Sequence, residues 1–139
     1  MAQFQRNHKV RFSQTDYAGI MFYPRYFEML NAVVEDWFDD ALGVSFSTLL
    51  DKHQLGSPLA GIDTQFMAPC RLGEILNFEL DVKRVGASSV TLDVIARCGS
   101  ENRMQSVMTH VCVSRDISKA VPWPDDLRAR MLECLEERN

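Results

Sequence analysis

One long amphipathic segment constrains the fold of this chain more than any other feature of the sequence. Between Pro24 and Leu42, apolar residues recur at intervals of three and four, as in a helix packed against a large surface. Proline is favoured at the first helical position, and Gly43 suits the left-handed conformation that ends many helices. The apolar residues of this predicted helix are Phe27, Leu30, Val33, Val34, Trp37, Phe38 and Ala41.

Alternating apolar and polar residues predict β-strands on both sides of this helix. A first strand is expected from Phe4 to Phe12, and a second helix from about Pro124 to Glu137 at the C-terminal end. Between the two helices, short turns separate four further alternating runs, which favours antiparallel hairpins. These runs are Gly61–Ala68, Ile75–Val85, Ser89–Cys98 and Met104–Arg115.

This order of elements predicts an α+β architecture, in which an antiparallel five-stranded sheet wraps around a long central helix. The 139 residues fit a single domain, residues 1–139. One helix cannot cover both faces of such a sheet. We therefore expect apolar surface to be buried between copies of the chain, in a homo-oligomer that is at least a dimer.

Composition and charge exclude several classes of protein. Hydrophobic residues make up 46% and charged residues 24%, which argues against disorder. A net charge of −4 provides no general attraction for nucleic acid or an anionic membrane. The four cysteines and three histidines show no zinc-binding spacing. Neither a signal peptide nor a long apolar run is present, so we expect a cytoplasmic protein.

The segment TDYAGIMFYPRY, residues 15–26, places a carboxylate and a glycine just before the long helix. Two interpretations of Asp16 are open. In the first, its carboxylate only accepts hydrogen bonds from backbone N–H groups of a turn. In the second, it attacks a thioester carbonyl or activates water, while unpaired N–H groups at the helix start stabilise the oxyanion. Gly19 would let the backbone approach the ligand.

The run DYAGIMFYPRYF resembles the signature of the 4-hydroxybenzoyl-CoA thioesterase family, in which Asp is followed by Ala-Gly-Ile, aromatic residues, Tyr-Pro and a further Tyr. The segments GSPLAGIDTQFMAPCRLGE and VPWPDDLRARM are also similar to that family, so the resemblance covers nearly the whole chain. It implies the hot-dog fold and hydrolysis of an acyl-CoA thioester without metal or cofactor. It further implies a dimer as the minimal active unit, and usually a tetramer made of two dimers.

The resemblance also implies roles for individual residues. Asp16 would be the nucleophile or general base, and the backbone N–H of Tyr23 the main oxyanion donor. Gly19 would shape the loop, and Phe22 would help to wall the acyl pocket. The predicted substrate-binding set is completed by Tyr26, Asp63, Lys83 and Arg84. The simpler interpretation makes Tyr26 a packing residue and Asp63 a solvent-facing strand residue, although in the family that strand lies near the neighbouring active site.

The sequence departs from the family pattern at two places. The turn that carries a basic, phosphate-binding run in the aryl-CoA enzyme reads Gly-Ala-Ser-Ser at residues 86–89, with only Lys83 and Arg84 just before it. Phosphate contacts must therefore come from these two residues, or from Arg71, Arg97 or Arg103. Many relatives also carry an acid where this chain has Asn31, which would leave Asp16 as the catalytic carboxylate of the helix region.

Three functions remain open from the sequence. The leading hypothesis is hydrolysis of an acyl-CoA thioester. The substrate would be 4-hydroxybenzoyl-CoA, another aryl-CoA or a short-chain acyl-CoA, because the aromatic residues of the motif suit flat and short aliphatic acyl groups alike. A hydratase or dehydratase of the same fold would need a positioned histidine with a carboxylate, and no histidine lies near Asp16 in the sequence. A non-catalytic module that binds acyl thioesters would not need the acid at Asp16.

Overall fold

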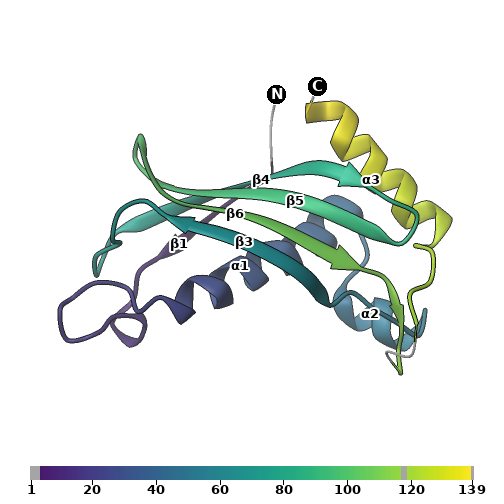
Figure 1. The fold of residues 1–139 in the computed structure, drawn as a ribbon, viewed down its shortest axis with the longest axis horizontal. Helices are drawn as coiled ribbons and strands as arrows, with labels where there is room; N and C mark the ends of the chain where they lie inside the picture. The colour runs from purple at the N-terminus through teal and green to yellow at the C-terminus, as the bar shows by residue number, and fades with distance from the viewer. Residues whose placement is uncertain (1–3, 117–118, 139) are drawn as a thin grey trace.

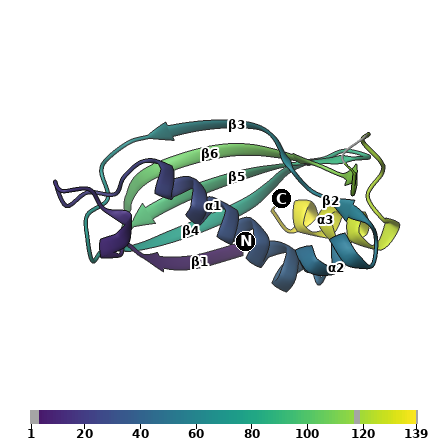
Figure 2. The same cartoon turned by 90° about the horizontal axis from the view of Figure 1, so that it is seen from below.

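An antiparallel sheet curves around one long helix in the computed structural model, which describes residues 4–116 and 119–138 (Figure 1). The helix, α1 (Pro24–Trp37), runs along one face of the sheet, which is best seen from below in Figure 2. The predicted α+β architecture, with a five-stranded sheet, a central helix and a C-terminal helix, is confirmed. In spatial order the strands are β1 (Phe4–Lys9), β4 (Ile75–Val85), β5 (Ser89–Cys98), β6 (Glu101–Val111) and β3 (Leu59–Phe66).

Helix α1 turns its apolar side to the sheet, as its periodicity predicts. Pro24 occupies the first helical position. The last turn before Gly43 is a π-helical segment, η2 (Phe38–Leu42), and Gly43 ends it in the left-handed conformation with φ +74°. The predicted helix end at Leu42 is therefore confirmed. The buried residues of α1 are Tyr26, Met29, Leu30, Val33, Val34 and Trp37.

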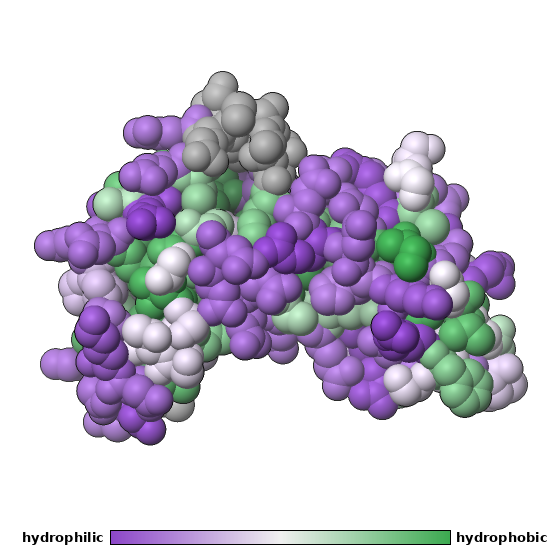
Figure 3. Space-filling model, turned by 180° about the vertical axis from the view of Figure 1, so that it is seen from behind, coloured by the Kyte–Doolittle hydropathy of each residue, from purple (hydrophilic) through white to green (hydrophobic). Residues whose placement is uncertain are grey.

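The two faces of the sheet differ in chemistry. The face toward α1 is almost entirely apolar and buried, with residues such as Phe78, Leu92 and Met108. The opposite face carries polar pairs, in which Arg97 binds Glu79, Gln105 binds Asp93 and Thr91 binds Thr109. Figure 3 looks at the molecule from behind, toward the β1 edge of the sheet, and there too hydrophilic residues cover most of the middle. The expectation of a large uncovered apolar face is therefore wrong, since hydrogen-bonded polar side chains occupy the second face.

Exposed apolar side chains gather instead on the edge strand β3. This strand pairs with β6 on one side and with nothing on the other in the described part of the chain. Leu59 and Ile62 are each 40% exposed and Phe66 is 48% exposed. An unpaired edge of this length with apolar side chains is a surface on which another strand can add.

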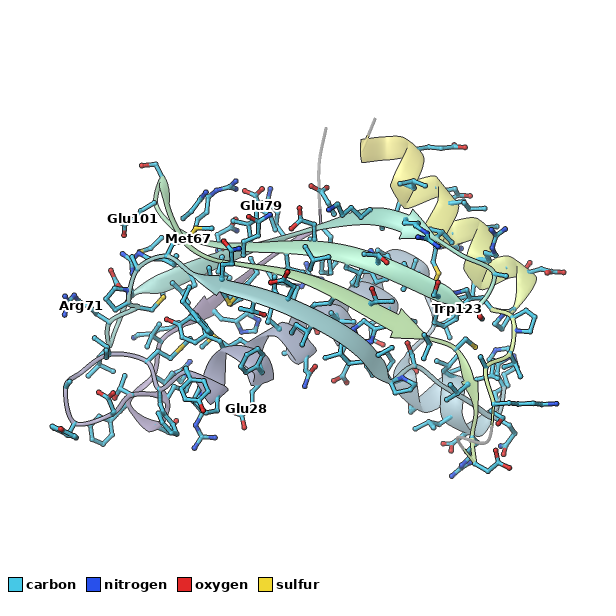
Figure 4. All side chains as sticks on the ribbon, in the orientation of Figure 1. Glu28, Met67, Arg71, Glu79, Glu101 and Trp123 are labelled. Carbon is cyan, nitrogen blue, oxygen red and sulfur yellow. The ribbon has the colours of Figure 1, made fainter. Side chains whose placement is uncertain are left out.

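The C-terminal part of the chain closes the far end of the core. The predicted second helix, α3 (Asp125–Arg138), buries Leu127 and Met131. The indole N–H of Trp123 donates to the carbonyl oxygen of Ser89 at 3.1 Å, which ties the start of α3 to the sheet. Figure 4 labels Trp123 at this end of the molecule. None of the helices in residues 4–116 and 119–138 combines the length and apolarity that crossing a membrane requires.

One predicted boundary needs correction, and one small sheet was not predicted. The first strand ends at Lys9, and Phe12 lies 81% exposed in a 3-10 turn, η1 (Phe12–Gln14), because the chain turns there toward α1. Residues 45–58 form a helix, α2 (Phe46–Asp51), and a short strand, β2 (Leu55–Gly56). This strand pairs with β7 (Val113–Ser114), a second small sheet that the sequence pattern did not predict.

Candidate active site

The loop that carries Asp16 is closed by hydrogen bonds of its own backbone. We call residues 15–23 the Asp16 loop. The N–H of Asp16 donates to the carbonyl oxygen of Ile20 at 2.9 Å, and the N–H of Gly19 donates to the carbonyl oxygen of Asp16 at 3.0 Å. Gly19 has φ +79°, a conformation that costs residues with a Cβ atom about 1–2 kcal/mol. The left-handed backbone conformation of Gly19 thus gives a physical reason for the shaping role predicted for this residue.

A second loop, residues 67–74, holds the Asp16 loop against the sheet, and we call it the supporting loop. The N–H of Met21 donates to the carbonyl oxygen of Cys70 at 2.7 Å, and the N–H of Leu72 donates to that of Gly19 at 3.1 Å. The supporting loop also continues directly into β4, which begins at Ile75. The position of Asp16 therefore depends on residues about 50 positions further along the chain.

The carboxylate of Asp16 is exposed and only partly engaged. Its Oδ1 atom accepts a hydrogen bond from the N–H of Ala18 at 2.8 Å. Its Oδ2 atom has no hydrogen-bond partner among residues 4–116 and 119–138. Asp16 therefore acts as a turn residue, as the first interpretation predicts, and still has one oxygen available to react or to accept a proton. Both interpretations are compatible with this geometry.

The start of α1 presents an unpaired backbone donor next to this loop. The N–H groups of Arg25 and Tyr26 donate to the carbonyl oxygens of Phe22 and Tyr23. Pro24 has no N–H, and the N–H of Tyr23 has no acceptor within the described residues. The dipole of α1 adds a partial positive charge at the same place. This donor is suited to an anionic oxygen.

An open groove of about 310 Å³ begins at these residues. The ring of Tyr26 packs against Phe66 with centroids 4.9 Å apart, and the ring of Phe22 meets that of Tyr23 at 5.7 Å. Burial and then the Cys70 thiol raise the pKa of Tyr26, so its hydroxyl stays protonated. The groove is lined by Ile20, Met21, Tyr23, Tyr26, Phe66, Met67, Ala68 and Pro69.

Three predicted substrate-binding residues lie apart from the Asp16 loop. Asp63 is exposed on β3, opposite Val107 of β6. Lys83 and Arg84 are exposed near the end of β4 that is remote from the supporting loop. At about 3.3 Å per residue, they lie on the order of 25–30 Å from the start of this strand. They cannot lie beside Asp16 of the same chain.

The other cations considered from the sequence divide into two groups. Arg97 is bound to Glu79, and Arg103 is bound to Glu74 and Glu101, so their charges are already paired. Arg71 is exposed, and its backbone bridges to Ile20 of the Asp16 loop. Its side chain extends outward from the loop end of the molecule in Figure 4.

The ion pair between Arg103 and Glu74 was missed by sequence reasoning. Glu74 ends the supporting loop, and Arg103 is buried beside that loop with only 8% of its surface exposed. Glu74 lies in a predicted turn and Arg103 lies next to one, so the alternation of apolar and polar residues gives no indication that they pair. Their pairing joins residues 29 positions apart and exists only in the folded chain.

The histidines do not reach the candidate site. His110 is buried, and its Nδ1 atom lies 3.0 Å from the carbonyl oxygen of Ser57. His8 stacks edge-on against Phe78 within the sheet, and His53 lies exposed after α2. The hydratase alternative therefore gains no support from this geometry, because no histidine of this chain lies on the Asp16 loop.

Comparison with known proteins identifies the family. Residues 10–131 match the model of the thioesterase-like superfamily, which is most of the chain. The chain belongs to the thioesterase-like superfamily. The match includes the Asp16 loop, α1, four of the five strands of the large sheet and the first half of α3, and it begins just after β1.

Relatives of this superfamily member include named aryl-CoA hydrolases. A 1,4-dihydroxy-2-naphthoyl-CoA hydrolase of Thermosynechococcus vestitus is 25% identical over 138 residues, covering 99% of this chain and 92% of the relative. The hydrolase of the same name from Synechocystis is 24% identical over 126 residues, covering 89% of this chain and 91% of the relative.

Solved structures of the superfamily share the fold of this chain. A 1,4-dihydroxy-2-naphthoyl-CoA thioesterase from Synechocystis superposes with a TM-score of 0.85 at 19% identity, covering 95% of this chain and 97% of that one. A gentisyl-coenzyme A thioesterase superposes with a TM-score of 0.81 at 23% identity, covering 89% and 98%. The predicted hot-dog fold is thus confirmed.

Replacing Gly19 by alanine tests the backbone requirement of the loop in this superfamily member. Apart from the two chain neighbours of Gly19, no described residue has an atom within 4 Å of the added Cβ, so the substitution costs only the left-handed strain, about 1–2 kcal/mol. We expect a lower kcat for thioester hydrolysis, since relief of that strain would shift the Asp16 loop. Gly99→Ala is the matched control, because Gly99 has φ +60° with equally open space in the β5–β6 turn. Equal kcat values for the two variants would contradict the prediction.

Proposed function

We propose that this chain is an acyl-CoA thioesterase that hydrolyses the thioester to a carboxylic acid and free CoA. The observation that carries the proposal is the unpaired N–H of Tyr23, at the positive end of α1 and on the same short loop as Asp16. Membership in the thioesterase-like superfamily supports the same reaction class. A thiol-release assay on a panel of acyl-CoA substrates tests it directly.

The N–H of Tyr23 serves as the oxyanion donor in this proposal. As the thioester carbonyl becomes tetrahedral, negative charge develops on its oxygen, and a fixed donor stabilises that charge more than the ground-state carbonyl. The helix dipole of α1 adds to this effect. Loss of one such donor typically lowers kcat by about 10²–10³-fold.

Asp16 supplies the second half of the reaction. With Oδ1 held by Ala18, the Oδ2 atom either attacks the carbonyl carbon or removes a proton from a water molecule that attacks it. In the first route the C–S bond breaks to release the CoA thiolate, and water then cleaves the resulting anhydride. In the second route the water oxygen bonds to the carbonyl carbon as the CoA thiolate leaves.

The groove beside the loop favours an aromatic acyl group. Its walls are formed largely by apolar and aromatic side chains, which include the tilted ring pair of Tyr26 and Phe66 and the side chain of Met67. Relatives named for 1,4-dihydroxy-2-naphthoyl-CoA and gentisyl-CoA support an aryl-CoA over a short aliphatic one. 4-Hydroxybenzoyl-CoA, the substrate that the signature motif implies, belongs to the same class and heads the panel to be assayed. The proposed contacts to the ring are Tyr26, which lines the groove, and Phe22, which is not part of the lining but packs against Tyr23 of it.

The active unit in this proposal is at least a dimer. A second copy would pair along β3 and cover its exposed apolar residues Leu59, Ile62 and Phe66. Because Phe66 and Met67 also line the groove, such a partner would complete the acyl pocket. Asp63, exposed on the same strand, would then lie at the boundary between the two copies. Two dimers would form the tetramer that the resemblance implies.

The CoA phosphates need cations from more than one part of the assembly. Arg71 lies at the Asp16 loop, whereas Lys83 and Arg84 lie at the remote end of β4. In this proposal, Lys83 and Arg84 therefore serve the site of a neighbouring copy. Because the chain carries a net charge of −4, phosphate affinity must depend on such local cations.

Asp16→Asn should remove most of the hydrolysis while leaving the fold and assembly intact. The amide keeps the shape of the side chain but loses its nucleophilicity and basicity, so kcat should fall by about 10²-fold or more. Saturating aryl-CoA with spectrophotometric thiol detection measures this change. Asp39→Asn, on the exposed start of η2, is the control. A near wild-type kcat in Asp16→Asn would refute the assignment.

Ile62→Lys should dissociate the proposed dimer, because it places a charge in the surface that β3 would bury. Light scattering at micromolar concentration should then show monomers, with lower activity since the groove loses its second wall. Leu50→Lys on α2 changes a side chain with the same 40% exposure and should leave assembly unchanged. A wild-type chain that is monomeric at this concentration would contradict the proposal.

Lys83→Ala and Arg84→Ala should each raise KM for aryl-CoA while barely changing kcat. A remote phosphate contact binds the ground state and the transition state alike, and its effect should shrink as salt rises. A short aryl thioester without the nucleotide should not respond to either change. Lys52→Ala, which changes an exposed lysine just after α2, is the control. If both substrates respond equally, neither residue contacts the phosphates.

A further inference from the structure

Arg103 is a buried charge whose position in the sheet is irregular. Between β5 and β6, Ala96 pairs with Met104 and Arg97 pairs with Asn102, so that Arg103 is an extra residue in a β-bulge. A bulge breaks the alternation of a strand and redirects the side chain of the extra residue. The guanidinium of Arg103 is accordingly directed to the supporting loop, residues 67–74.

Arg103 binds this loop at both of its ends. Its Nη1 and Nη2 atoms donate to the two carboxylate oxygens of Glu74 at 2.7 and 2.9 Å, a bidentate pair. Nη1 also donates to the carbonyl oxygen of Pro69 at 2.9 Å. The carbonyl oxygen of Arg103 accepts from the N–H of Met67 at 2.8 Å. One residue of the sheet thus fixes the start, the middle and the end of the supporting loop.

Glu74 completes this connection from the other side. Its Oε1 atom also accepts from the backbone N–H of Arg71 at 2.7 Å, which closes the turn at the end of the loop. Hydrogen bonds from Arg103, and next from the Arg71 N–H, lower the pKa of Glu74 to about 2. The ion pair therefore persists at neutral pH. From this loop, Cys70 accepts a hydrogen bond from Met21 and Leu72 donates one to Gly19, and both of these partners follow Asp16 in the Asp16 loop.

The free energy of a buried ion pair does not explain this arrangement by itself. Removing two charges from water costs several kcal/mol per ion, and well-packed apolar residues often stabilise a fold as much or more. A bidentate arginine–carboxylate pair supplies directional geometry that apolar contacts lack. Its effect should therefore be found in the position of the loop more than in the stability of the fold.

We propose that the Arg103–Glu74 ion pair positions the Asp16 loop for hydrolysis, with Arg103 and Glu74 as positioning residues that do not touch the substrate. This inference rests on the proposed thioesterase function. The ion pair acts through two sets of backbone hydrogen bonds, first on the supporting loop and then on the Asp16 loop. A displacement of reacting groups by about 1 Å can lower a rate by up to roughly 10²-fold, so small shifts of this loop matter.

Two variants separate positioning from stability. Arg103→Lys keeps the charge but loses the bidentate geometry, and the double variant Arg103→Met, Glu74→Leu removes both charges together. We expect kcat to fall about tenfold in both, with KM within about twofold of wild type, because substrate contacts are unchanged. The melting temperature of the double variant should stay close to wild type. Arg97→Lys alters another ion pair, with Glu79 on the outer face, and should leave kcat unchanged.

Amide hydrogen exchange gives a readout that does not depend on activity. The N–H groups of Met21 and Leu72 join the two loops, so both should exchange faster in Arg103→Lys while amides of β5 keep their protection. Faster exchange at these two amides together with the lower kcat supports the proposal. An unchanged kcat in the double variant, or a lower kcat without faster exchange, overturns it. If the wild-type chain releases no thiol from any acyl-CoA of the panel, the thioesterase assignment fails, whereas the exchange result still tests the connection between the loops.

Discussion

The burial of one side of α1 against a curved sheet is the interaction on which the rest of this structure depends. Leu30 and Val33 of the helix and Phe78 and Leu92 of the sheet are completely buried. Removing such a side chain from water contributes about 1.5–3 kcal/mol each. Because only one side of the helix and one face of the sheet are apolar, these two surfaces must face each other, which fixes the orientation of α1. Its first turn is thereby fixed where β1 ends and β4 begins, and so is the free N–H of Tyr23.

The two loops at the start of α1 have irregular backbone, whose N–H and C=O groups need hydrogen-bond partners outside regular helices and strands. Two segments far apart in the sequence satisfy each other, since Met21 donates to Cys70 and Leu72 donates to Gly19. The ion pair beneath them ties the second segment to β6. A rigid loop with one exposed carboxylate oxygen results. Such a loop can hold a reactive group in place without burying it, which suits a carboxylate that must stay charged.

Substrate choice depends on features of a different kind. In the proposed mechanism, the Asp16 loop acts on the thioester itself, which every acyl-CoA substrate shares. The acyl group would instead meet the walls of the groove, formed here by Tyr26, Phe66 and Met67. Relatives named for naphthoyl and gentisyl groups differ in the size and hydroxylation of the ring. One methylene in an apolar pocket changes binding by only about 1–3 kcal/mol, so in the proposed function discrimination among such rings would depend on the whole groove wall, including any residue from a second copy.

Local patterns in the sequence determined the main elements of this protein. The three-and-four spacing from Pro24 to Leu42 predicted the helix, and Gly43 ended it, because these are properties of neighbouring residues. Alternation likewise predicted the strands of the sheet, and the motif around Asp16 and Gly19 predicted the loop. The pattern failed at Phe12, where alternation continues in the sequence although the chain has already left the sheet.

Only the tertiary structure decided how the distant parts of the site meet. Lys83 and Arg84 lie within β4, as the sequence predicted. The length of this strand places them far from Asp16 of the same chain. Arg103 and Glu74 pair across 29 positions, and the bulge that makes this possible breaks the alternation on which sequence reasoning relies. Periodicity reports which face a residue occupies within one element. The partner of a buried charge is selected by the packing of several elements at once, and that information is absent from any single stretch of sequence.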